Sequence, residues 1–213
     1  MYIAIEGVIG VGKTTLARLL QSTFDADLLL EVFEENPFLS DFYADRERYA
    51  FQTQIFFLLS RYHQQRRAVP AILDSGKTLI SDYTFAKDSL FARINLKGDE
   101  LDMYFRVHEA LAEKIVLPDL LVYLRANTDV LMQRIATRDR SYERNMDRGY
   151  IEMLNQAYED FFSRPYNDTP VLVLDTNPLD FVHNGGHLHL IENRIRESLH
   201  LPPFQPQLPL TAK

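Results

Sequence analysis

The feature that most constrains this chain is a glycine-rich segment near its N-terminus, GVIGVGKT at residues 7–14. It follows an apolar, β-rich run at residues 2–5 and leads into helical hydrophobic spacing at residues 14–24. The segment matches the pattern G-x-x-x-x-G-K-[ST] in full and in the strand-to-helix context that the pattern requires. An ordinary glycine-rich turn is the alternative, and the agreement of motif and context disfavours it. We therefore predict a site for a nucleoside triphosphate.

The chemistry of such a site explains its composition. Glycines let backbone N–H groups turn inward around phosphate oxygens, and the start of the helix adds positive potential. Lys13 is expected to neutralise the β- and γ-phosphate oxygens, and the Thr14 hydroxyl is expected to bind Mg²⁺. The residues predicted to hold the triphosphate here are Gly7, Gly10, Val11, Gly12, Lys13, Thr14 and Thr15.

Apolar β-rich runs alternate with helical patterns along the whole chain. The runs cover residues 2–5, 27–32, 78–81, 119–124 and 171–174, and the helical patterns cover residues 14–24, 46–68, 100–116, 129–138 and 151–162. This alternation predicts an α/β fold with a five-stranded parallel sheet and helices on both faces. Its ligand crevice should lie at the C-terminal ends of the strands. We predict one domain over residues 1–200 and a Pro-rich tail at residues 201–213.

Composition narrows the class of partner. The 213 residues favour a single domain, and 23 Lys and Arg against 30 Asp and Glu give a net charge of −7. This balance argues against general nucleic-acid coating and against an anionic membrane surface. The chain has no cysteine, which excludes disulfides and thiol catalysis and fits a reducing compartment. The first strand begins at residue 2, and no apolar run approaches the roughly 18 residues of a membrane span. We expect a cytoplasmic protein.

Two acids follow predicted strands. Glu31 lies at the end of the second strand and Asp82 directly after the third, so both should face the crevice above the glycine-rich loop. Asp82 suits an acid at the metal, and Glu31 suits a group that accepts a proton from an acceptor hydroxyl. A helix cap or a solvated loop acid is the alternative for each of them.

Five arginines fall between residues 134 and 148 of this net-acidic chain. Guanidinium groups match phosphate oxygens and supply positive charge to a transferring phosphoryl group, the role expected here for Arg138. A solvated helix whose arginines pair with neighbouring acids is the alternative. With the glycine-rich loop present, we expect a lid at about residues 134–148 that closes over the triphosphate.

Several of these motifs together resemble the deoxynucleoside kinases, in particular the bacterial deoxyadenosine and deoxyguanosine kinases, from residue 1 to about residue 181. The segment EVFEENPFL at residues 31–39 is similar to the family's Glu-Pro-Val segment, with Val32 in place of the proline. The resemblance implies a P-loop kinase fold, ATP with Mg²⁺ as the phosphate donor, and a homodimer. It also implies that Glu31 lies beside the 5′-hydroxyl of the substrate.

The resemblance assigns further residues to the nucleoside. Tyr43 matches the tyrosine that binds the sugar 3′-hydroxyl, Gln54 the glutamine that pairs with the base, and Glu143 an acid that contacts the sugar. Arg61 follows Gln54 by seven residues, two helical turns, so both should face the same way. Asp88 matches an acid that works with Arg61 at the edge of the base.

The resemblance also covers the donor. Arg134, Arg138 and Arg140 match phosphate-binding arginines of the lid, and Asp180 with Phe181 resembles the loop that holds the adenine of ATP. Tyr83 is also a candidate for binding the nucleoside. It departs from the family pattern, because many members carry an arginine at this position. A lid arginine is a candidate substitute for that charge.

The sequence therefore predicts transfer of the γ-phosphate of ATP to the 5′-hydroxyl of a deoxynucleoside, with a purine favoured. The assignment of the proton acceptor stays open between Glu31 and Asp82, with Glu31 favoured. The alternatives are a nucleoside-monophosphate kinase and a non-catalytic regulator that binds nucleotides. A monophosphate acceptor would need an additional arginine for its phosphate, and the Asp82-Tyr83 pair lacks one at the expected place.

Overall fold

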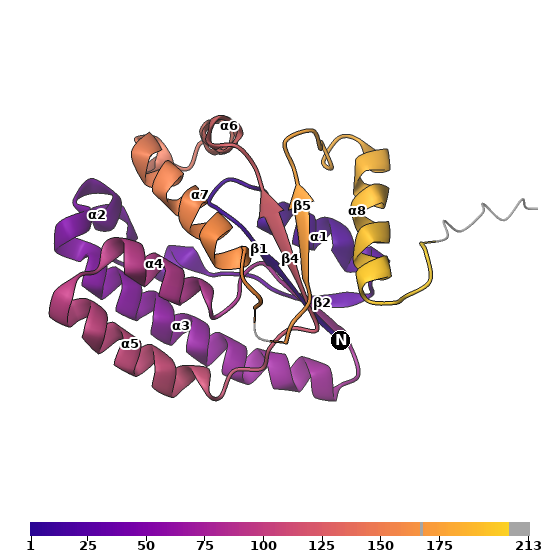
Figure 1. The fold of residues 1–213 in the computed structure, drawn as a ribbon, viewed down its shortest axis with the longest axis horizontal. Helices are drawn as coiled ribbons and strands as arrows, with labels where there is room; N and C mark the ends of the chain where they lie inside the picture. The colour runs from indigo at the N-terminus through magenta and orange to yellow at the C-terminus, as the bar shows by residue number, and fades with distance from the viewer. Residues whose placement is uncertain (167, 205–213) are drawn as a thin grey trace, which may run out of the picture.

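The computed structural model describes residues 1–166 and 168–204. Within these residues five parallel strands form one sheet in the order β2-β3-β1-β4-β5 (Figure 1). The strands are β1 (Tyr2–Glu6), β2 (Ala26–Leu29), β3 (Thr78–Ser81), β4 (Leu120–Arg125) and β5 (Val171–Asp175). The predicted fold class is confirmed, and all five strands were expected close to their observed positions.

The central strands read as continuous apolar runs because helices cover both faces of a parallel sheet. All five residues of β1 and the first five of β4 are buried. The second strand was predicted too long, since β2 ends at Leu29 rather than at residue 32. Within the described residues β2 pairs with β3 alone, and its last partner, Ser81, is the end of β3. Glu31 therefore lies beyond the sheet, in the connection that follows β2.

Five helices match predicted ones: α1 (Lys13–Thr23), α3 (Arg46–Asp74), α5 (Gly98–Ala112), α6 (Thr128–Arg138) and α7 (Arg148–Phe162). Helix α3 continues through Pro70, whereas the prediction ended at residue 68. Three helices were missed: α2 (Leu39–Ala44), α4 (Lys87–Asn95) and α8 (Gly185–Ser198). Asn184 marks the start of α8 in the sequence, because asparagine is favoured directly before the first turn of a helix. Its side chain accepts hydrogen bonds from the backbone of Gly186 and His187.

The helices form unequal layers around the sheet. Figure 1 shows α1 and α8 on one side and α3, α4, α5 and α7 on the other. The predicted tail is described only as far as residue 204, where the Phe204 ring stacks on His189 at 5.3 Å; the rest of it lies outside the described residues. No helix in the described ranges has the length and apolar character needed to cross a membrane.

Candidate active site

The loop between β1 and α1 wraps around the ammonium group of Lys13. This group donates to the carbonyl oxygens of Gly7 at 2.7 Å and Val8 at 3.1 Å. Burial, together with the nearby charge of Lys87, lowers the pKa of Lys13 to about 8. A Cβ atom at Gly7 would collide with the carbonyl oxygen of Leu124 on β4, so the loop can approach the sheet this closely only with glycine there.

A buried carboxylate, Glu6, supports this loop from below. One of its oxygens accepts from the Gly7 N–H at 3.2 Å and lies 3.2 Å from the Tyr158 hydroxyl. The other accepts from the backbone N–H and the hydroxyl of Thr84 at 2.6 and 2.9 Å. Glu6 is fully buried and therefore ties the loop, the segment after β3 and helix α7 together.

Thr14 and Asp82 bring oxygen atoms together beside the loop. The Thr14 hydroxyl donates to Asp82 Oδ2 at 2.5 Å, and the backbone N–H of Glu31 donates to Asp82 Oδ1 at 2.8 Å. Hydroxyl and carboxylate oxygens are the ligands that Mg²⁺ prefers, usually as one or two groups completed by water and phosphate. Thr14 and Asp82 supply two such groups. The described residues contain no cluster of three or more His, Asp or Glu that could hold a metal by themselves.

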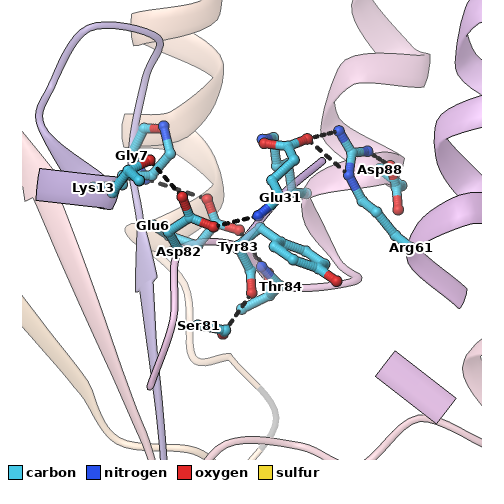
Figure 2. A network of polar contacts seen from close by, with 12 residues as sticks. Glu6, Gly7, Lys13, Glu31, Arg61, Ser81, Asp82, Tyr83, Thr84 and Asp88 are labelled. Atoms are coloured by element: carbon cyan, nitrogen blue, oxygen red, sulfur yellow. Dashed lines mark hydrogen bonds and ion pairs between the residues drawn. The ribbon is translucent and has the colours of Figure 1, made fainter. Parts of the chain in front are cut away.

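The carboxylate of Glu31 lies between two cations, Arg61 and Lys87, and Figure 2 shows its contact with Arg61. Arg61 on α3 donates to Oε1 through Nε at 3.0 Å and through a terminal nitrogen, while Lys87 Nζ lies 2.6 Å from Oε2. Arg61 also donates to the fully buried Asp88. Burial alone would raise the pKa of Glu31, but the charges of Arg61 and Lys87 outweigh it and hold that pKa well below its usual range.

A single cavity joins these groups to the predicted nucleoside residues. Its wall includes Ile9, Gly10, Lys13, Thr14, Glu31, Phe33, Tyr43, Gln54, Phe57, Arg61, Asp82, Lys87, Phe91, Arg138, Arg140, Tyr142 and Glu143. Several aromatic rings line the cavity, among them Tyr43, which stacks on Tyr142 at 6.0 Å. A larger hollow of about 1010 Å³ lies elsewhere, beside α4, α5 and α7, and its lining includes no residue of the phosphate loop.

Two arginines of the arginine-rich segment, Arg138 and Arg140, line this cavity. Arg138 makes paired hydrogen bonds to Glu143 at 2.6 to 3.1 Å, and Arg140 lies over the ring of Phe33 at 4.0 Å. Arg144 instead pairs with Asp139 at the surface, as the alternative interpretation of this segment expected. Arg148 likewise makes exposed ion pairs on the outside. The ion pairs of Arg138 and Arg140 with Glu143 also match that alternative, and a lid that closes over the triphosphate stays a prediction.

Comparison with known proteins agrees with this geometry. The profile of the family described as deoxynucleoside kinase matches residues 3–200. A deoxyguanosine kinase of Bacillus subtilis (strain 168) is 33% identical over 199 residues, covering 92% of this chain and 96% of its own. A deoxyadenosine/deoxycytidine kinase of the same organism is 30% identical over 206 residues, covering 93% of each. The structure of a deoxyadenosine kinase from M. mycoides with bound dATP has a TM-score of 0.80 at 29% identity, covering 92% of this chain and 100% of its own.

The chain belongs to the deoxynucleoside kinase family. It is a P-loop kinase, and its reaction is the ATP-dependent phosphorylation of a nucleoside 5′-hydroxyl.

Most of the predicted site residues of this kinase converge. The cavity brings together residues from six separate parts of the chain: Gly10, Lys13, Thr14, Glu31, Tyr43, Gln54, Arg61, Asp82, Arg138, Arg140 and Glu143. Asp88 stands behind Arg61, on the far side from Glu31 (Figure 2). Phe181 is buried under the loop, with its ring 3.0 Å from where a Cβ of Gly12 would be. Asp180 is exposed and accepts hydrogen bonds from the turn that follows it.

Two predicted residues have different surroundings from those expected. The structure does not bring Tyr83 to the cavity: this side chain is fully buried, and its hydroxyl donates to Gln64 at 2.6 Å. We therefore do not retain Tyr83 as a nucleoside-binding residue. Arg134 donates to the backbone of Val11 and to Thr176, so it braces the phosphate loop against the segment after β5.

Sequence reasoning missed three contributors to the site. Lys87 was not predicted as a site residue because its helix, α4, was not predicted. Its spacing from Asp82 also gives no indication that it reaches the site. Glu6 carried a weak signal, as a charged residue that closes an apolar strand directly before the first glycine of the loop. Phe33 gave no signal among 14 phenylalanines, and only the fold places it under Arg140.

The ion pairs of Glu31 predict how stability depends on pH. Because its pKa is lower in the folded chain than the usual value of about 4.3, its ionisation stabilises the fold above that pH, and the stabilisation is lost as the pH falls. We expect Glu31→Gln to unfold with a shallower acid dependence than the wild type, by at most about 1.4 kcal/mol per pH unit.

Urea unfolding at a series of pH values between neutrality and pH 3 measures this slope. Glu109→Gln, at an exposed position of α5, is the control for the loss of one carboxyl group. Equal slopes for Glu31→Gln and the wild type would contradict the ion pairing described here.

Proposed function

We propose that the acceptor is a purine deoxynucleoside and that its 5′-hydroxyl is bound beside Glu31. The observation that carries this proposal is the single cavity shared by the phosphate loop, Glu31 and Gln54. The carboxamide of Gln54 can form two hydrogen bonds with the edge of a base, and the Arg61–Asp88 pair can reach further polar atoms. The deoxyguanosine kinase of Bacillus subtilis supports the choice of a purine, whereas the second relative from that organism is named for both deoxyadenosine and deoxycytidine.

In the proposed reaction, the bond between the 5′-oxygen and the γ-phosphorus forms as the bond to the β,γ-bridging oxygen breaks. The departing electron pair stays on ADP, and the hydroxyl proton passes to the carboxylate of Glu31. A weak base suffices because phosphoryl transfer depends mostly on positioning and electrostatic stabilisation. Lys13 and Arg138 supply positive charge to the phosphate oxygens, and Tyr43 with Glu143 binds the sugar.

We also propose that Mg²⁺ accompanies ATP, with Thr14 and Asp82 as its protein ligands. The support is the 2.5 Å contact between the two side chains beside Lys13, which gathers hard oxygen atoms at the phosphate end of the cavity. When bound, the ion neutralises charge on the β- and γ-phosphates. The remaining donor contacts proposed are those of the loop backbone, of Arg134, Arg138 and Arg140, and of Asp180 and Phe181 around the adenine.

The acceptor is proposed to be a nucleoside rather than a nucleoside monophosphate. A second phosphate would need guanidinium groups at the acceptor end of the cavity. Arg61, which lies there, is already paired with both Glu31 and Asp88.

The quaternary state and location belong to the same proposal. We infer a homodimer, supported by apolar side chains exposed on neighbouring helices, among them Leu59 of α3 at 40% and Met103 of α5 at 49%. A cytoplasmic location is supported by the absence of cysteine, which suits a reducing compartment. A single domain over residues 1–200 with a lid near residues 134–148 completes the proposal.

A phosphotransfer assay with ATP and Mg²⁺ tests the acceptor. The panel contains deoxyadenosine, deoxyguanosine, deoxycytidine and thymidine, with dAMP and dTMP as controls. We expect the highest kcat/KM for a purine deoxynucleoside and no product from the monophosphates. Faster turnover of deoxycytidine would contradict the purine preference, and activity on a monophosphate alone would contradict the acceptor class.

The proton acceptor is tested by Glu31→Gln and Asp82→Asn. We expect Glu31→Gln to lower kcat by about 10²–10⁴-fold, the usual contribution of a general base, with the Kd for the nucleoside nearly unchanged. Single-turnover kinetics and nucleoside titrations separate these quantities. Turnover near the wild-type rate in Glu31→Gln, with a loss confined to Asp82→Asn, would transfer the role to Asp82.

A further inference from the structure

A buried lysine that the proposed mechanism does not use lies beside Glu31 in the wall of the cavity. Lys87 is the first residue of α4, and its side chain is only 7% exposed. Its ammonium group lies 2.6 Å from Glu31 Oε2 and 5.5 Å from the centre of the Phe91 ring. Lysines this deeply buried are rare unless they are paired, because removing an ammonium group from water is costly.

The residue next to Asp82 does not provide a positive charge beside Glu31. Tyr83 is directed away from the Glu31 carboxylate in Figure 2, and its hydroxyl is bonded to Gln64. The charge that faces Glu31 therefore comes from α3, through Arg61, and from the first turn of α4, through Lys87.

The two cations differ in how fully they are engaged. Arg61 spans Glu31 and Asp88 and so has acids on both sides. Within the described residues, the polar partner of the Lys87 ammonium group is Glu31. An ammonium group carries three donors, so Lys87 can bind a further oxygen while it keeps Glu31.

The charges around the cavity indicate what that oxygen belongs to. A phosphoryl group that moves from the loop toward Glu31 carries negative charge past two carboxylates, those of Glu31 and Asp82, which repel it. Lys13 offsets this repulsion at the donor end, where it is bound to the loop carbonyls. Lys87 lines the same cavity and stands beside Glu31, at the acceptor end.

We propose that Lys87 is a catalytic residue whose ammonium group contacts the phosphoryl group in transit and then the 5′-phosphate of the product. The role rests on the proposed position of the 5′-hydroxyl beside Glu31. Lys87 exchanges no atom in the reaction. It supplies the charge that this chain lacks at position 83.

Lys87→Met removes the charge and keeps the length of the side chain, while Lys87→Arg keeps the charge. Lys97→Met, at an exposed position just after α4, is the matched control. We expect Lys87→Met to lower kcat by about 10²–10³-fold, as does the loss of one group that stabilises transition-state charge, with KM values within about threefold of the wild type. Lys87→Arg should regain at least part of this loss, and Lys97→Met should behave as the wild type.

Binding measurements give a readout that a merely structural role would not produce. By calorimetry, Lys87→Met should bind the 5′-monophosphate product at least about tenfold more weakly while its affinity for the nucleoside stays within about threefold. Equal losses for both ligands, or unchanged affinity for the monophosphate, would overturn the proposal. Lys87→Gln is the second neutral variant, with the same expected outcomes, if Lys87→Met does not fold.

Wild-type turnover, measured in parallel, separates this claim from the one on which it rests. An active wild type with an equally active Lys87→Met variant contradicts the role of Lys87 alone. A wild type that phosphorylates no deoxynucleoside contradicts the proposed function and this role with it.

Discussion

The carboxylate of Glu31 is held between the guanidinium group of Arg61 and the ammonium group of Lys87, and the three charges come from three separate parts of the chain. Burying any one of them alone would be strongly unfavourable, so each depends on the others being in place. The pairing fixes the connection after β2 against α3 and α4. It also keeps an ionised acid at the wall of the cavity, beside the proposed position of the acceptor oxygen.

At the phosphate end of the cavity, charged side chains are again held by the polar groups around them. There the cation is the partly buried Lys13, bound to loop carbonyls, and the anion is the fully buried Glu6, which receives four hydrogen bonds. Asp82 links the two ends, because one of its oxygens accepts from Thr14 and the other from the backbone of Glu31. The two ends are therefore joined through the two hydrogen bonds of one carboxylate.

Much of this arrangement was predictable because it follows from local rules. The phosphate loop, the parallel sheet and the crevice at the strand ends are coded by short-range patterns, and the resemblance to the family supplied Gln54, Arg61 and Asp88. The sequence could not show that Tyr83 turns inward to Gln64 or that Lys87 replaces a charge at that position. The first depends on packing against α3, and the second on α4, which lacked a recognisable cap, so neither follows from spacing. The end of β2 was predicted wrongly for a related reason. It coincides with the end of its partner strand β3, which the local pattern of β2 does not show.

The most direct measurement is a crystal structure of the enzyme with deoxyadenosine bound. We expect the 5′-oxygen within hydrogen-bonding distance of the Glu31 carboxylate, about 3 Å, with Lys87 beside it and the base against Gln54. This expectation would be contradicted by a nucleoside whose 5′-oxygen contacts Asp82 while Glu31 remains paired with Arg61 and Lys87, out of reach of the substrate.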